Sequence, residues 1–171
     1  DKADGYEIST SDGYVAASNA FVENGALKII NVGNGRSRLL KQTSAATKAF
    51  KVSFDFMQDE LSNITCLART SNADGNHAAF ELYTENGNIG VRCNVPQGGI
   101  SNEVIYEGYK AGEWYNIEYY VNLDKKAFSI SVNGEPCSNS NFEFLSDFVT
   151  DYYNLNRVFD TYNQSKGVYY I

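Results

Sequence analysis

The chain has few of the residues from which metal centres and disulfide frameworks are built. Its 171 residues include one His, three Cys, one Met, one Trp and two Pro. The cysteines, Cys66, Cys93 and Cys137, are odd in number and show no C-x-x-C spacing, so neither a zinc site nor a complete disulfide framework is predicted. Cys66 and Cys93 lie inside apolar strand patterns, where we expect free thiols that pack as small hydrophobes.

Long apolar runs and excess positive charge are also missing. No stretch approaches the roughly 18 consecutive apolar residues that a membrane span needs. The formal net charge of −7 and the sequence pI of about 4.7 disfavour binding to nucleic acid or to an anionic membrane, because the summed field would repel both. We expect a single domain over residues 1–171, monomeric, secreted or on the cell surface, and excised from a larger protein.

Aromatic residues are abundant, with 13 Tyr and 10 Phe, and together with many Asn and Gly they favour an all-β fold. Short strand-like runs separated by turn signals predict a two-sheet antiparallel β-sandwich. These runs are 14–17, 26–31, 38–42, 50–57, 64–70, 77–83, 89–94, 104–106, 114–122, 127–132, 155–161 and 168–171.

Turn chemistry supports this interpretation at three places. Asn24-Gly25, Asn86-Gly87 and Asn133-Gly134 each lie between apolar runs, and Asn-Gly readily adopts the positive φ angles of a tight hairpin. Only residues 140–148 have helical character, because Ser140 and Glu143 have capping-box spacing. We expect one or two helical turns there.

Alternation within the strands predicts which side chains face outward. In residues 50–56 the apolar residues alternate with polar ones, so one side should face the core. Applied to the next strands, the same rule places six polar or aromatic residues on one open sheet face: Arg69, His77, Glu81, Tyr83, Arg92 and Asn94.

The order of motifs along nearly the whole chain resembles the concanavalin A-like, laminin G-like jelly-roll domains that accompany secreted bacterial polysaccharide-degrading proteins. The motifs are residues 24–31, 50–56, 112–118, 128–134 and 167–171. The resemblance implies two stacked antiparallel sheets, carbohydrate bound on a concave face or its rim, and in many relatives a structural calcium ion. The Asp74-Gly75-Asn76 turn could coordinate calcium, but it lacks the oxygen spacing of an EF-hand loop, and the metal ligands stay unknown.

Catalytic patterns of enzymes with this fold are missing from the sequence. No Glu-x-Asp occurs, although laminarinase-type hydrolases use it to place two carboxylates at the scissile bond. His77 is the only histidine and follows Gly75-Asn76, so the Gln-x-His strand of alginate-lyase relatives is also absent. We therefore predict a non-enzymatic domain.

The open face has the groups that sugar binding requires, namely aromatic rings for stacking and planar polar groups for hydroxyls. Trp114 and Tyr120 are further candidates for stacking, although a Trp at the start of a strand also suits a partly buried position. The predicted function is a non-catalytic carbohydrate-binding module that targets an attached enzyme or surface protein to polysaccharide. The alternatives are a polysaccharide lyase or glycoside hydrolase of the same fold, a protein-binding adhesion domain, and an ordinary solvated sheet face with cross-strand ion pairs.

Overall fold

We describe residues 7–9, 20–31, 37–43, 48–71, 77–96, 98–137, 142–146, 155–161 and 167–171 in a computed structural model of the protein. These residues form fifteen strands and no helix, which confirms the all-β prediction. The first eight strands are β1 (Glu7–Ser9), β2 (Ala20–Glu23), β3 (Ala26–Asn31), β4 (Ser37–Thr43), β5 (Ala49–Gln58), β6 (Ile64–Ser71), β7 (Ala78–Glu85) and β8 (Asn88–Val95). The remaining strands are β9 (Gly99–Tyr106), β10 (Tyr115–Asn122), β11 (Ala127–Val132), β12 (Glu135–Pro136), β13 (Phe142–Glu143), β14 (Leu155–Thr161) and β15 (Gly167–Tyr170).

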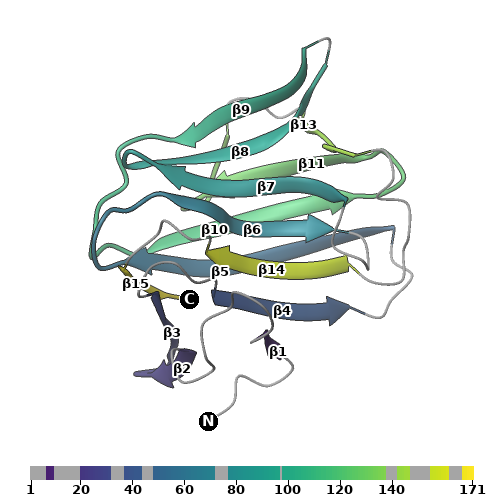
Figure 1. The fold of residues 1–171 in the computed structure, drawn as a ribbon. Coiled ribbons are helices and arrows are strands. Elements are labelled where there is room, and N and C mark those ends of the chain that lie inside the picture. The colour runs from purple at the N-terminus through teal and green to yellow at the C-terminus, as the bar shows by residue number, and fades with distance from the viewer. Residues whose placement is uncertain are drawn as a thin grey trace.

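All strand pairs are antiparallel, and the curled sheet folds into two layers. The front layer has the order β1-β4-β14-β6-β7-β8, with β9 paired to the outside of β8. The back layer has the order β11-β10-β5-β15-β3-β2, with β12 paired to β11. Figure 1 views the front layer with the back layer behind it. The short strand β13 pairs with β8 and with β11 and so joins the two layers.

The core lies between the layers and is rich in aromatic rings. The Phe80 ring of the front layer contacts the Tyr119 and Phe128 rings of the back layer, with centroids 4.9 Å and 4.5 Å away. Alternation is observed in β5. Val52 and Phe56 are buried and Phe54 is partly buried, whereas Lys51, Ser53 and Asp55 are exposed. The predicted outward and inward sides of this strand are confirmed.

Three tight turns have the predicted Asn-Gly conformation. Asn24, Asn86 and Asn133 have φ angles of 52°, 51° and 52°, and each following glycine also has a positive φ. Such angles match the right-handed twist of the flanking strands. The second of these turns joins β7 to β8 and thereby fixes their register.

A buried polar network links the layers at one end of the sandwich. The Gln58 side chain of β5 donates a hydrogen bond to the Ser62 carbonyl (3.2 Å) and accepts one from the Tyr109 hydroxyl. Thr84 Oγ1 donates to the same Ser62 carbonyl (3.1 Å) and accepts from the backbone N–H of Ile64 (3.0 Å). Because these groups satisfy one another in the core, they hold β5, β6 and β7 in fixed relative positions.

One local prediction is wrong. Phe142 and Glu143 form β13, and Phe144 to Ser146 are not helical, whereas a helical turn was expected over residues 140–148. Phe142 and Phe144 are both buried and Glu143 is exposed, which is the alternation of a strand. The predicted strand at 14–17 and the turn at 74–76 lie outside the described residues.

The predicted burial of two cysteines is observed. Cys66 and Cys93 are both buried, and Cys93 and the partly exposed Cys137 are free thiols. Burial, together with the charge of Glu103, raises the pKa of Cys93 to about 12. This thiol is therefore protonated and unreactive at neutral pH.

Candidate functional site

A groove of about 580 Å³ opens on the outer face of the front layer. It crosses β7, β8 and the edge strand β9, and it reaches the start of β6. The groove is lined by Asn63, Ile64, Glu81, Tyr83, Thr84, Glu85, Arg92, Ile100, Ser101 and Asn102. Most of these groups are polar, and the lining includes one aromatic ring, Tyr83.

A row of polar side chains runs across four strands beside the groove. Backbone register places Arg69 opposite Glu81, Glu81 opposite Arg92, and Arg92 opposite Asn102. The Glu81 carboxylate lies 3.5 Å from Nη1 of Arg69 and 3.4 Å from Nη1 of Arg92. The Arg69 side chain is 13% exposed and that of Arg92 is 51% exposed. Arg92 therefore has guanidinium donors available to a ligand, while the largely buried Arg69 pairs with Glu81 from the neighbouring strand β6.

The ring of Tyr83, a residue of β7, lies over the neighbouring strand β8. Its register partner on β8 is Gly90, and a Cβ atom at Gly90 would come within 2.2 Å of Tyr83 Cζ. The ring therefore occupies the space that any other residue at position 90 would fill. Burial raises the pKa of the Tyr83 hydroxyl, and the charges of Glu85 and Glu103 raise it further. The hydroxyl is thus protonated at neutral pH and can both donate and accept a hydrogen bond.

The outer wall of the groove is the edge strand β9. Ile100 and Val104 are 61% and 51% exposed. Both lie on the same face as Asn102, because each is two residues away from it along the strand. Val104 on β9 and Tyr83 on β7 are the two register partners of Gly90 on β8, so they lie on either side of this glycine. Apolar groups thus flank the polar row, which suits a ligand with both hydroxyl groups and C–H faces.

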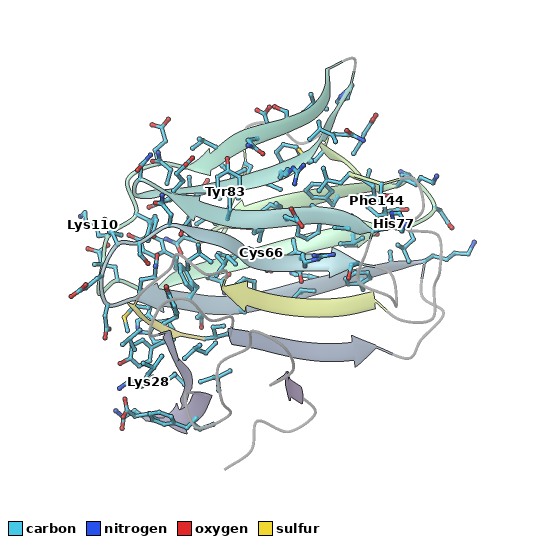
Figure 2. The ribbon with its side chains drawn as sticks, in the orientation of Figure 1. Lys28, Cys66, His77, Tyr83, Lys110 and Phe144 are labelled. Atoms are coloured by element: carbon cyan, nitrogen blue, oxygen red, sulfur yellow. The ribbon has the colours of Figure 1, made fainter. Side chains whose placement is uncertain are left out.

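Two of the predicted residues lie on the front layer but away from the groove. Asn94 has the same parity on β8 as Arg92, yet its Nδ2 donates to the Phe144 carbonyl at 2.8 Å and so anchors the segment after β13. His77 precedes β7, outside the strand where it was expected, and its Nδ1 lies 3.2 Å from Ser146 Oγ. Figure 2 shows His77 and Phe144 together at one end of the layer and Tyr83 apart from them.

The two remaining predicted residues lie on the back layer. Tyr120 pairs with Lys51 and Ser129 on β5 and β11 and is 43% exposed. Trp114 precedes β10 and is 47% exposed. Since Tyr119 next to Tyr120 points into the core against Phe80, Tyr120 points away from the front layer. The structure thus brings Arg69, Glu81, Tyr83 and Arg92 together and separates the other four.

Several groove residues were not predicted, chiefly Asn102, Ile100 and Ser101. The sequence predicted a strand only over residues 104–106, whereas β9 begins at Gly99. Pro96 and the Gly98-Gly99 pair conceal this start, because they indicate a loop. The alternation of Ile100, Asn102 and Val104 after the glycines is the signal that could have located the strand.

Among the described residues, no group of three or more His, Cys, Asp or Glu side chains is arranged to hold a metal ion. The expected calcium ion is not tested by this result and stays a prediction. No helix in the described part of the chain is long and apolar enough to cross a membrane.

No protein-family model and no curated protein matches the sequence. Solved structures do match. A sialidase is similar over 94% of this chain, with a TM-score of 0.67 and 17% identity. An alginate lyase from Pseudomonas aeruginosa is similar over 91% of this chain and 83% of its own, with a TM-score of 0.58 and 14% identity. A Trypanosoma rangeli sialidase in complex with sialic acid is similar over 89% of this chain, with a TM-score of 0.62 and 13% identity.

The chain has a concanavalin A-like jelly-roll fold. This confirms the fold that the motif order implied. The jelly roll spans only 14% of the first sialidase and 25% of the Trypanosoma rangeli sialidase, but most of the alginate lyase. The same architecture therefore occurs both as a small part of a carbohydrate-active enzyme and as nearly a whole one.

Proposed function

We propose that this protein is a non-catalytic carbohydrate-binding module whose ligand lies in the groove over β7, β8 and β9. The observation that carries the proposal is the combination, in one open groove, of the Tyr83 ring, the exposed Arg92 guanidinium and the Asn102 side chain. A pyranose presents C–H groups on its faces and hydroxyls at its edge. An aromatic ring beside planar hydrogen-bonding groups complements both.

One acidic residue of the groove already has partners. Glu81 and Glu85 both line the groove and both come from β7. Glu81 lies between two arginine guanidiniums, so each oxygen of its carboxylate already has a partner, which supports a role in holding the groove together rather than in hydrolysis.

Proton transfer of the kind that a lyase needs is also poorly supported. The raised pKa of Tyr83 disfavours the phenolate form that would act as a base. His77, the one histidine in the sequence, contacts Ser146 rather than the groove. The second candidate is nevertheless a polysaccharide lyase, because an alginate lyase is similar over 83% of its own length.

We further propose that the module works outside the cell as part of a larger protein and keeps an attached enzyme or surface protein close to polysaccharide by raising its effective concentration. The sialidase similarity supports this arrangement, since the matching region is 14% of that chain. A structural calcium ion remains part of the proposal. Running each binding assay with and without a chelator tests it directly.

Affinity electrophoresis through gels that contain cellulose, xylan, mannan, β-glucan, pectin or alginate tests the function. We expect retardation on at least one glycan, weakened about tenfold or more by Tyr83→Ala and by Arg92→Ala, which corresponds to about 1.4 kcal/mol. Tyr120→Ala and Lys51→Ala are the matched controls, because they remove an exposed tyrosine and an exposed cation from the back layer.

The outcomes separate the candidates. Retardation of both groove variants equal to that of the wild type on every glycan would reject the groove as the site. Release of unsaturated sugar from any glycan would favour the lyase. Absence of retardation on every glycan would favour the protein-binding alternative.

A further inference from the structure

A row of large side chains crosses the outer face of the back layer. Phe21 on β2 is opposite Lys28 on β3, Lys28 is opposite Tyr170 on β15, and Tyr170 is opposite Met57 on β5. Trp114 continues the row, because the next residue, Tyr115, is opposite Phe56. Directly paired residues point to the same face, and the adjacent residues Tyr169 and Phe56 are buried in the core.

The three rings of this row are held in place before any ligand arrives. Nζ of Lys28 lies 5.8 Å from the Phe21 centroid and 5.6 Å from the Tyr170 centroid, so one ammonium group binds two ring faces. The Trp114 ring meets the edge of Tyr170, with centroids 6.2 Å apart and an interplanar angle of 64°. A surface that is already ordered loses less side-chain entropy on binding.

The row has no unbalanced charge. Nζ of Lys28 forms a 2.8 Å ion pair with Glu23, and the two side chains are only 19% and 39% exposed. The neighbouring row on β5 and β10 is polar, because Asn116 Nδ2 donates to Asp55 at 2.8 Å. The aromatic row is therefore bordered there by hydrogen-bonding groups, which suits a ligand with hydroxyl groups at its edges.

We propose that this row, Phe21, Lys28, Tyr170, Met57 and Trp114, is a second glycan-binding surface, which takes a neutral polysaccharide chain lying across the strands. The row crosses four strand spacings, or about 19 Å, which is long enough for several sugar units. Neutral sugars fit because stacking on Trp114 and Phe21 needs C–H faces, and the single cation already has its carboxylate. The inference rests on the proposed carbohydrate-binding function but uses none of the groove residues.

Trp114 is the only tryptophan in the sequence, so tryptophan emission, excited at a wavelength that tyrosine does not absorb, reports on this row alone. Neutral oligosaccharides of glucose, xylose and mannose are titrated into the wild-type protein while tryptophan emission and iodide quenching are recorded. We expect at least one series to shift emission to shorter wavelength and to protect Trp114, now 47% exposed, from iodide. The Tyr83→Ala/Arg92→Ala double variant should show the same change, because the groove lies on the other layer.

Affinity electrophoresis on the matching polymer provides the second measurement. Trp114→Ala should weaken retardation about tenfold or more, whereas Tyr120→Ala, an exposed tyrosine on the same face of the same layer, should leave it unchanged. The proposal is overturned if emission and quenching stay constant with every oligosaccharide. It is also overturned if protection from iodide follows protein concentration alone, since that would show self-association. Weaker retardation of the groove variants on one glycan, with an unchanged Trp114 response to a neutral oligosaccharide, would support the proposal by showing that the two surfaces bind separately.

Discussion

Replacing Gly90 with alanine is the sharpest test of the groove, because Gly90 is not one of the residues that line it. A Cβ atom at Gly90 would lie 2.2 Å from Cζ, 2.4 Å from Oη and 2.6 Å from Cε2 of Tyr83. Ordinary contacts between carbon atoms are about 3.5–4.0 Å. The tyrosine ring must therefore rotate out of its place across β8.

The expected change in the free energy of unfolding is small. Overpacking a well-packed site costs about 1–3 kcal/mol, and the lower end applies because the Tyr83 side chain is only partly buried and can swing toward solvent. Alanine in a strand gains about 0.5–1 kcal/mol over glycine through lower backbone entropy in the unfolded state. These effects nearly cancel, so Gly90→Ala should destabilise the protein by no more than about 1 kcal/mol.

Glycan binding should respond much more strongly than stability. With the ring displaced, affinity in the gel assay should fall to nearly the value of Tyr83→Ala. Urea unfolding of the wild type, both single variants and the double variant completes a double-mutant cycle. In the Tyr83→Ala background the alanine at position 90 meets no ring, so there it should stabilise the protein by about 0.5–1 kcal/mol.

Two results would refute this reasoning. Equal stability changes for Gly90→Ala in both backgrounds would show that the ring does not lie over Gly90. Undiminished glycan binding in Gly90→Ala, together with weakened binding in Tyr83→Ala, would show that the position of the ring across β8 is not what the ligand requires.

Three further predictions concern stability. Glu81→Ala should lower the free energy of unfolding, measured in urea, by about 1–3 kcal/mol, because it removes the carboxylate partner of the largely buried Arg69. Lys51→Ala, which breaks an exposed ion pair, should change it by less than about 1 kcal/mol. Equal effects of the two substitutions would contradict this prediction. Asn94→Ala should cost about 1 kcal/mol through the lost bond to the Phe144 carbonyl and leave glycan retardation unchanged, so weakened retardation would return Asn94 to the binding site. The pKa of Cys93 is raised to about 12 in the folded state, whereas a thiol in the unfolded chain has a pKa of about 8.5. The free energy of unfolding should therefore be unaffected by this thiol below about pH 8.5 and should fall by up to about 1.4 kcal/mol per pH unit from there to about pH 12. Over this range the urea midpoints of Cys93→Ala should decline less steeply than those of the wild type.

The local alternation of the sequence predicted much of the site. Arg69, Glu81, Tyr83 and Arg92 lie on one face because each strand alternates and the Asn86-Gly87 turn fixes the register of β7 against β8. These are short-range properties of the chain, and a sequence expresses them directly.

Long-range pairing was beyond the reach of the same reasoning. Trp114, Tyr170 and Phe21 come from distant parts of the chain, and only the strand order β10-β5-β15-β3-β2 brings them into one row. At β13 the spacing of Ser140 and Glu143 suggested a helix, while the competing alternation of Phe142 and Phe144 covered too few residues to decide. Burial of both phenylalanines against the sandwich determines the outcome.

The two proposed binding surfaces lie on opposite outer faces of the sandwich. The layers are about 10 Å apart, so polymers bound over Tyr83 and over Trp114 lie on opposite sides of a thin and rigid domain. One molecule would then cross-link two polysaccharide chains. A solution of a soluble glycan should thicken or turn cloudy as the protein is added and clear again when the protein is in large excess, because each strand is then saturated and none is shared.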